Sequence, residues 1–300
     1  MLKFFKNLIQ PKDNKPVVDN GVTAPLSEIQ LKSVRDLAQN HYEPVQLLVA
    51  SGQSVGQQRE LNEDCLFTLA TTIAGNSGSL PFGLFIVADG MGGHQYGEVA
   101  SNTAIRSISS YVIKKFHNSL FALPSRPVEE SLQEILQAAV NEAQQSVLKE
   151  APGSGTTVTA ALIIGQQLTI AQVGDSRGYL LYNNQRMEAI TRDHSLVRRL
   201  EELGQITAAE AAVHPQRNVL YRAVGQGETL EADIVTTPFP IGGYLLLCSD
   251  GLWGLVSDEE MSRIVYGTPN IQRACQELVA AANSAGGPDN ISVVLVQLLG

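Results

Sequence analysis

Cysteine is scarce in this chain of 300 residues, which contains Cys65, Cys248 and Cys275 and no others. Because the three are odd in number and far apart in the sequence, they offer neither a disulfide framework nor a Cys-x-x-Cys metal site. We therefore expect three free thiols, buried as small apolar side chains.

Long apolar runs are also missing. No stretch approaches the roughly 20 uninterrupted apolar residues that a membrane-spanning helix needs. The N-terminus lacks the apolar core and the small-residue cleavage site of a signal peptide. The sequence thus predicts a cytoplasmic protein with no transmembrane segment.

Basic residues are in the minority, with 21 Lys and Arg against 30 Asp and Glu and a formal net charge of −9. A chain with this charge repels a phosphate backbone, and no basic run is long enough to offset the repulsion. We expect no nucleic acid among its partners.

The length and a hydrophobic content of 44% allow one core of roughly 250 residues with a short extension. Prolines interrupt any regular pattern before residue 44, so residues 1–44 are interpreted as a flexible N-terminal extension and residues 45–300 as the folded domain. Residues 1–9 are interpreted as a frayed tail. The alternative is a short amphipathic helix for a membrane surface or a partner.

From Val45 onward, short apolar runs alternate with amphipathic stretches, which favours a mixed domain of sheets and helices. Runs rich in branched residues predict strands at 83–88, 157–164, 168–173, 244–248 and 291–298. Apolar residues at every fourth position predict helices over 98–117, 128–149 and 271–284. The charged segment 193–222 breaks this rhythm and is interpreted as a partly helical insert near the functional site.

Acidic residues lie at the ends of several predicted strands. They are Glu63, Asp64, Asp89, Asp175, Asp250 and Asp289. Three of them precede Gly or Asn, and each such pair alone would be an ordinary turn former. If these strand ends meet, the repulsion among the carboxylates costs several kcal/mol unless cations lie between them. The pattern therefore indicates a metal site.

The type of cation follows from the donors. Oxygen ligands without clustered cysteines or a His-Glu-x-x-His pair favour Mg²⁺ or Mn²⁺ over zinc or copper, and the absence of an EF-hand loop disfavours calcium. Two such ions about 3.5–4 Å apart can deprotonate a bridging water and polarise a phosphoryl oxygen without a covalent intermediate. No cysteine nucleophile is in place for a phosphatase mechanism of the thiol type, because no arginine follows Cys248 at the spacing of a Cys-x5-Arg loop.

Seven short motifs resemble, in order and spacing, those of the PP2C-type (PPM) metal-dependent protein serine/threonine phosphatases. They occupy residues 59–64, 87–94, 155–157, 173–177, 191–195, 248–252 and 287–292, within a span of about 46–299. The Met-Gly-Gly-His form of residues 91–94 is similar to that of bacterial members. The resemblance implies an α+β fold, a four-layer α/β/β/α sandwich of two antiparallel sheets flanked by helices, with residues 193–222 as a small flap beside the cleft.

The resemblance also implies metal ligands. Asp89 would bridge two ions, with Glu63 and the Gly90 carbonyl on one of them and Asp250 and Asp289 on the other. With Asp250, Asp175 matches a third-metal position of bacterial relatives. The alternative for Asp175 is a turn pinned against Arg177.

Further roles follow from the same resemblance. Arg59 would bind the phosphate with its planar fork of donors, the alternative being a surface salt bridge. Asp64 would hold metal-bound waters, and Asn290 would order the Asp289 loop. From its place after the Asp250 turn, Trp253 is expected to pack in the core beneath the site, with stacking on the substrate as the alternative.

One departure concerns the general acid. Many eukaryotic members carry histidine directly after the Asp-Gly pair, where this chain has Met91. The proton for the leaving alkoxide must then come from a metal-bound water or from another group. His94 is the nearest candidate in the sequence, with a structural hydrogen-bonding role as the alternative, and His194 is a weaker candidate.

The resemblance implies hydrolysis of phosphoserine and phosphothreonine in proteins by a metal-bridging water or hydroxide. We expect a monomer that opposes a serine/threonine kinase in signalling. One alternative is a catalytically silent relative that binds a phosphoprotein as a regulatory module, although no metal-site acid is lost here. Another keeps the enzyme but gives it an anti-sigma-type regulator as substrate and residues 1–44 as a docking element.

Overall fold

The computed structural model of the chain describes residues 44–75, 78–92, 96–122 and 127–300. The described residues all belong to one compact unit, Tyr42–Gly300. Residues 1–43 lie outside the described ranges, so both interpretations of residues 1–9 and the boundary of the extension remain predictions. His94 also lies outside them.

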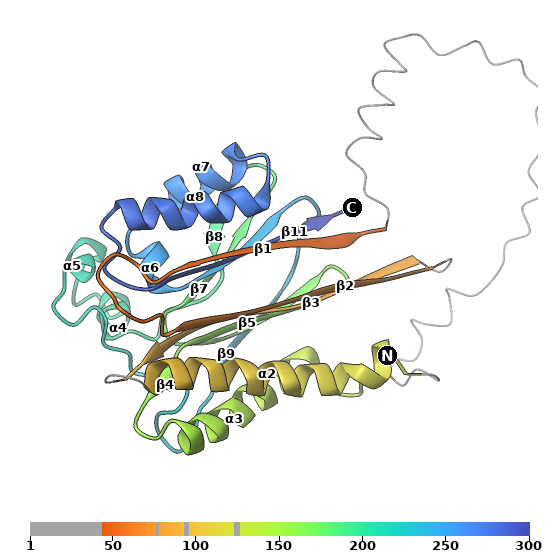
Figure 1. Cartoon of the computed structure of the whole chain (residues 1–300), viewed down its shortest axis with the longest axis horizontal. Coiled ribbons are helices and arrows are strands. Elements are labelled where there is room, and N and C mark those ends of the chain that lie inside the picture. Colours follow the sequence, from red (N-terminus) through yellow and green to blue (C-terminus); the bar gives the residue numbers. More distant parts are fainter. Residues whose placement is uncertain (1–43, 76–77, 93–95, 123–126) are drawn as a thin grey trace, which may run out of the picture. The chain divides into compact units, whose positions relative to one another are not determined.

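Two antiparallel sheets form the centre of the unit (Figure 1). One sheet has the strand order β1 (Gln46–Ser54), β11 (Ile291–Leu299), β10 (Tyr244–Cys248), β7 (Arg177–Leu181) and β8 (Met187–Ala189). The other has the order β2 (Asp64–Gly75), β3 (Gly78–Met91), β5 (Val158–Ile164), β6 (Gln167–Val173) and β9 (Asp233–Pro238). The short strand β4 (Gly155–Thr156) pairs with the end of β3.

Helices cover the outer face of each sheet (Figure 1). They are α2 (Tyr96–Leu120) and α3 (Leu132–Glu150) on one side and α7 (Asp258–Gly267) and α8 (Ile271–Ser284) on the other. The predicted four-layer sandwich is confirmed. Among the described helices, none has both the length and the apolar character needed to cross a membrane.

Strand β3 shows how the layers are held together. Its side chains alternate between faces, as the period of two requires. Phe85 and Val87 pack in the core between the two sheets, whereas Leu84 and Ile86 pack in the core beneath α2 and α3. All four side chains are fully buried. A strand buried on both faces has a continuous apolar sequence, which is why this part of β3 could be predicted.

The predicted helices are all present. The stripe of Ala100, Ala104, Ile108 and Val112 on α2 is buried, as its spacing predicts. The helix predicted from residue 128 begins later, at Leu132, because Ser131 forms a capping box with Glu134. The helix predicted over 271–284 has those same bounds.

The five predicted strands are also present, with one consequential difference. Strand β3 continues to Met91, so Asp89 and Gly90 lie inside a strand and not in the turn that their sequence suggested. Gly90 and Met91 stay extended because they pair with β4. Asp89 is thereby placed opposite Asp64 in the β2–β3 ladder.

The insert at residues 193–222 is partly helical, as predicted, and contains α4 (Leu196–Glu202) and α5 (Ala208–Ala212). At its base, Ser195 forms an antiparallel bridge with Leu220. We refer to residues 193–222 as the flap. The three cysteines are free thiols as predicted, although Cys65 is half-buried and not fully buried.

Candidate metal centre

A cavity of about 230 Å³ collects most of the acidic residues singled out in the sequence. Its lining includes Arg59, Glu63, Asp89, Gly90, Met91, Asp175, Asp250, Asp289 and Asn290. These residues come from the β1–β2 loop, the end of β3, the β6–β7 loop, the start of helix α6 (Asp250–Trp253) and the loop before β11. The fold thus brings together groups that are far apart in the chain.

Gly90 allows the backbone to close around this cavity. Its N–H donates a hydrogen bond to the Glu63 carbonyl, at 3.2 Å. A Cβ atom at Gly90 would lie 2.1 Å from the carbonyl oxygen of Gly97, a distance that no side chain can adopt. Glycine at this position therefore lets the β1–β2 loop, strand β3 and the start of α2 meet at the site.

Asn290 connects the last loop of the site to the first. Its Oδ1 accepts a hydrogen bond from the Glu63 N–H at 2.8 Å. Its Nδ2 donates to the carbonyls of Val55 and Leu61, at 2.8 and 2.9 Å. These bonds tie Asn290 to the loop that carries Glu63 and Arg59. The expected role of Asn290 in ordering the Asp289 loop stays a prediction.

The site is unfavourable for negative charge. Burial raises the pKa of Asp89 well above its usual range, and repulsion from Asp64 and Asp250 raises it further. Burial and then repulsion from Asp250 do the same to the pKa of Asp175. Burial, with Asp289 nearby, raises the pKa of Asp250 to about 6. Each carboxylate would be stabilised by a cation placed among them.

Asp64 lies behind these groups and is 6% exposed. The Ser249 hydroxyl donates a hydrogen bond to its Oδ2 at 2.7 Å. Burial raises the pKa of Asp64 to about 7 in spite of that hydrogen bond. Ser249 was missed in the sequence, although it directly precedes Asp250.

Buried carboxylate oxygens without a hydrogen-bond partner indicate where a cation could bind. Within the described ranges, Oδ1 of Asp64 and Oδ1 of Asp250 are the buried side-chain atoms without a hydrogen-bond partner. In the same ranges, no three acidic, histidine or cysteine side chains are already grouped to hold an ion by themselves. Mg²⁺ takes one or two carboxylates and keeps several waters, so it does not require such a group. The oxygen donors and the raised pKa values fit a hard divalent cation.

Arg59 lies beside the acids. Its Nη2 is 2.8 Å from Oδ2 of Asp289, and about half of its side chain is exposed. The salt bridge weighed as an alternative for Arg59 is therefore present, but its partner is an acid of the site. The guanidinium lines both this cavity and a larger neighbouring one.

The alternative role of Asp175 was to pin a turn against Arg177, but Arg177 pairs with a different acid. The carboxylate beside Arg177 is that of Asp193, with Nη2 and Oδ2 at 2.7 Å. Arg177 also stacks on the Trp253 ring, 3.6 Å from its centroid. The indole Nε1 of Trp253 donates to the Asp175 carbonyl at 3.0 Å. Trp253 packs against the core as predicted, but its half-buried ring also lines the larger cavity.

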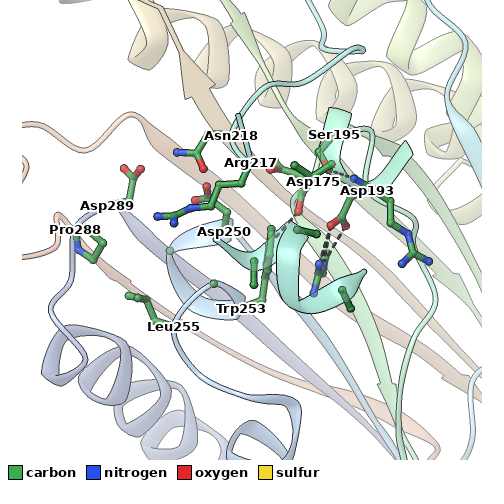
Figure 2. A pocket seen from close by; sticks show the side chains of 18 of the residues that line it. Asp175, Asp193, Ser195, Arg217, Asn218, Asp250, Trp253, Leu255, Pro288 and Asp289 are labelled. Carbon is green, nitrogen blue, oxygen red and sulfur yellow. Dashed lines mark hydrogen bonds and ion pairs between the residues drawn. The ribbon is translucent and has the colours of Figure 1, made fainter. Parts of the chain in front are cut away.

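The larger cavity, of about 770 Å³, lies between the flap and α6 (Figure 2). Its flap wall includes Val197, Ala211 and Arg217, and Trp253 and Leu255 lie on the α6 side. Arg59, Asp175, Asn218, Asp250 and Asp289 line both cavities. Arg217 and Asn218 were not singled out in the sequence, because no local pattern indicates that the flap approaches the acids.

Sequence comparisons agree with this geometry. The family profile described as "Protein phosphatase 2C" matches residues 49–291. The chain is 40% identical over 216 residues to the serine/threonine phosphatase stp of Listeria innocua, covering 71% of this chain and 84% of that protein. It is 35% identical over 247 residues to the protein phosphatase PhpP of Streptococcus pneumoniae, covering 81% of this chain and 94% of that protein.

Solved structures give the same result. The serine/threonine phosphatase PstP/Ppp of Mycobacterium tuberculosis aligns with a TM-score of 0.69 and 33% identity, over 85% of this chain and all of that one. A structure of the PstP catalytic domain in complex with two manganese ions aligns with a TM-score of 0.67 and 32% identity, over 85% and 100% of the two chains.

Proposed function

This chain belongs to the protein phosphatase 2C family, and we propose on that basis that it is a metal-dependent enzyme that hydrolyses phosphoserine and phosphothreonine in proteins. The observation that carries the proposal is the convergence of five acids on one small cavity beside an arginine, with a sixth acid, Asp64, buried behind them. Two of these acids have buried oxygen atoms without a partner in the described part of the chain.

The acids present divide into two sets around a shared residue. We propose that Asp89 contacts two divalent cations, with Glu63 and the Gly90 carbonyl holding one and Asp250 and Asp289 holding the other. Asp64, kept in place by Ser249, lies where it can accept hydrogen bonds from water at the site. The cations, when bound, supply positive charge for the phosphoryl oxygens and make a water nucleophilic near neutral pH.

Arg59 is proposed to bind the phosphate. Its planar fork of N–H groups matches two phosphoryl oxygens. The ion pair with Asp289 holds the guanidinium at the edge of the acidic cavity. Since half of the side chain is exposed, the free N–H groups of Arg59 remain accessible from the larger cavity.

The cavity between the flap and α6 is proposed to hold the polypeptide on either side of the phosphorylated residue. It is continuous with the metal centre through the residues that line both. Its lining combines the apolar side chains of Val197 and Leu255 with the cation of Arg217. Such a wall can contact an extended polypeptide without selecting a particular side chain next to the phosphorylated residue.

The leaving alkoxide needs a proton. Met91 lines the acidic cavity but has no proton to give. His94 stays the proposed general acid, since its intrinsic pKa suits proton transfer at neutral pH. His194 does not line either cavity and is buried, which argues against a direct role in proton transfer.

Several finer features also remain proposals. We propose that Mg²⁺ or Mn²⁺ occupies the two core positions, that Asp175 with Asp250 holds a third ion, and that the enzyme is a cytoplasmic monomer opposing a serine/threonine kinase. The silent-module alternative predicts loss of metal-site acids. All six acids are present in this chain.

A phosphopeptide assay tests the proposal. The purified full chain with Mn²⁺ should remove one phosphate from phosphothreonine and phosphoserine peptides, detected by mass spectrometry, and the Asp89→Asn variant should not. Binding of the peptides without any dephosphorylation by the wild-type chain would favour the silent module.

A further inference from the structure

His194 is 1% exposed and lies at the base of the flap, outside both cavities. We propose that His194 is a positioning residue, whose Nδ1 atom fixes the Asp175 loop and thereby sets the affinity of that loop for a divalent cation. The inference rests on the proposed role of Asp175 as a metal ligand.

Two hydrogen bonds join His194 to the residue before Asp175. The Gly174 N–H donates to His194 Nδ1 at 3.1 Å, and the His194 N–H donates to the Gly174 carbonyl at 2.8 Å. The side chain of Gln172 also donates to the Gly174 carbonyl, at 3.0 Å. The polar backbone groups of Gly174 are thus satisfied inside the protein, and His194 contributes to both.

The Gly174 backbone is tightly confined. Its φ angle is +95°, a conformation that favours glycine, and an added Cβ would lie 2.6 Å from the Thr157 side chain. On the far side, Trp253 donates to the carbonyl of Asp175. The direction in which the buried Asp175 carboxylate points therefore depends on a backbone held by His194 on one side and Trp253 on the other.

The contacts of the imidazole select one tautomer. Because Nδ1 accepts from Gly174, the ring proton lies on Nε2, which is 3.2 Å from Oδ2 of Asp233. Arg222 Nη1 donates a hydrogen bond of 2.7 Å to Oδ1 of that carboxylate and lies farther, at 3.4 Å, from Nε2, so the carboxylate is the nearer partner of both groups. Burial lowers the pKa of His194, which favours the neutral ring with a free lone pair on Nδ1.

The same residue belongs to the base of the flap. The Tyr221 N–H donates to the His194 carbonyl at 2.9 Å, and the two rings lie 5.6 Å apart. Next to it, the Leu196 N–H donates to the Val219 carbonyl at 2.8 Å. His194 therefore links the two segments at the flap base to the loop that carries Asp175.

Amide substitutions separate the two ring nitrogens. The oxygen of asparagine can replace Nδ1 as an acceptor, whereas the longer glutamine reaches the position of Nε2. We expect His194→Asn to bind Mn²⁺ within about threefold of wild type and His194→Gln to bind it about tenfold more weakly at the Asp175 position, as substitutions of groups that orient metal ligands do. Isothermal titration of the full chain with Mn²⁺ gives the affinities, and Asp175→Ala identifies the binding event that belongs to Asp175.

Two controls refine the assignment. Asp233→Asn changes the partner of Nε2 and of Arg222 but leaves the bond at Nδ1 in place, and it should bind Mn²⁺ as wild type does. In the Asp175→Ala background, His194→Gln should cause no further loss, because the two residues act through one loop. Equal losses in His194→Asn and His194→Gln, a wild-type affinity in His194→Gln, a loss in Asp233→Asn or a further loss in the double variant would each overturn the inference.

Mn²⁺ binding by Asp175→Ala and by His194→Gln distinguishes the role of His194 from the metal role of Asp175. If Asp175→Ala leaves Mn²⁺ binding unchanged, the third-ion proposal fails and this inference fails with it. If Asp175→Ala removes a binding event that His194→Gln leaves intact, the inference alone fails. Should His194→Gln not fold, the ¹⁵N shifts of His194 in the wild-type chain decide: a proton on Nε2 supports the inference, and a proton on Nδ1 overturns it.

Discussion

Arg59 and Asp289 form an ion pair in which Nη2 lies 2.8 Å from Oδ2. The pair joins the proposed phosphate-binding group to a proposed metal ligand. Asp289 can bind the guanidinium with one oxygen and a cation with the other. Among the described contacts, its Oδ1 accepts only the hydrogen bond from the Asn290 N–H, at 2.9 Å. Binding of phosphate and binding of metal should therefore respond differently to changes at Arg59.

Replacement of Arg59 by alanine should impair substrate binding. Hydrogen bonds to charged groups contribute about 1.5–3 kcal/mol each, which corresponds to a loss of roughly 10- to 150-fold in kcat/KM for p-nitrophenyl phosphate. The Mn²⁺ concentration for half-maximal activity should not rise, because Asp289 loses a competing partner. Arg59→Lys keeps the charge but loses the planar fork of donors. Its kcat/KM should fall between those of the wild type and Arg59→Ala. An unchanged KM, or a lost response to Mn²⁺, would contradict the role given to Arg59.

Without metal, the buried acids of the site should lower the stability of the folded chain. Asp250 is a buried carboxylate with a raised pKa, and its Oδ1 has no hydrogen-bond partner among the residues that the structure describes. Asp250→Asn should therefore raise the melting temperature in EDTA by several degrees, at about 2–4 °C per kcal/mol for a domain of this size. The wild-type chain should gain stability with Mn²⁺, and the variant should gain less.

An exposed control checks that stability experiment. Glu188 pairs with Arg186 at the surface, so Glu188→Gln should change neither the melting temperature in EDTA nor the gain with Mn²⁺. A metal-free Asp250→Asn variant that melts below wild type would show that the acids do not repel one another as described.

His194 should make stability depend on pH. Burial lowers its pKa in the folded chain, so the unfolded chain binds a proton first as the pH falls. The stabilisation by neutral His194 is present above the ordinary histidine pKa of about 6.5 and is lost as the pH falls towards the lower folded value. Denaturant unfolding at pH 8 to 5 should show the free-energy difference between wild type and His194→Asn shrinking by up to about 1.4 kcal/mol per pH unit. A constant difference would contradict this.

The general acid can be tested through the leaving group. p-Nitrophenolate is a stable anion and leaves without a proton, whereas a serine alkoxide needs one. His94→Gln should lower kcat for a phosphoserine peptide by about 10²–10⁴-fold and leave kcat for p-nitrophenyl phosphate nearly unchanged. Equal effects on both substrates would remove His94 from the acid role.

The N-terminal extension should be dispensable for catalysis. A chain of residues 45–300 should hydrolyse p-nitrophenyl phosphate as the full chain does. If residues 1–44 dock a cognate substrate, such as an anti-sigma-type regulator, dephosphorylation of that protein alone should fall. Loss of the small-substrate activity would place part of the folded domain before residue 45.

Local patterns in the sequence predicted the parts of the fold that depend on neighbours in the chain. The stripe on α8 gave its bounds, and the apolar run before Asp89 gave strand β3. Asp89, Asp250 and Asp289 were found because each stands beside a strand and a turn-forming residue. These signals span a few residues and need no knowledge of the tertiary structure.

Contacts between distant segments could not be predicted in the same way. Asp89 lies inside β3 because β4, far along the chain, pairs with Gly90. Ser249 supports Asp64 across the interface between the two sheets, and His194 reaches Gly174 from the flap. The sequence makes His194 a weak candidate for proton transfer, whereas in the structure it is buried and lines neither cavity.

Hydrolysis of p-nitrophenyl phosphate tests the central claim most directly, measured for wild type and Asp250→Ala, each with Mn²⁺ and with EDTA. We predict turnover by the wild-type chain with Mn²⁺, a loss of most of that activity in Asp250→Ala with Mn²⁺, and no turnover above background by either chain in EDTA. Equal turnover in all four samples, or none in any, would contradict the account of a metal-dependent phosphatase.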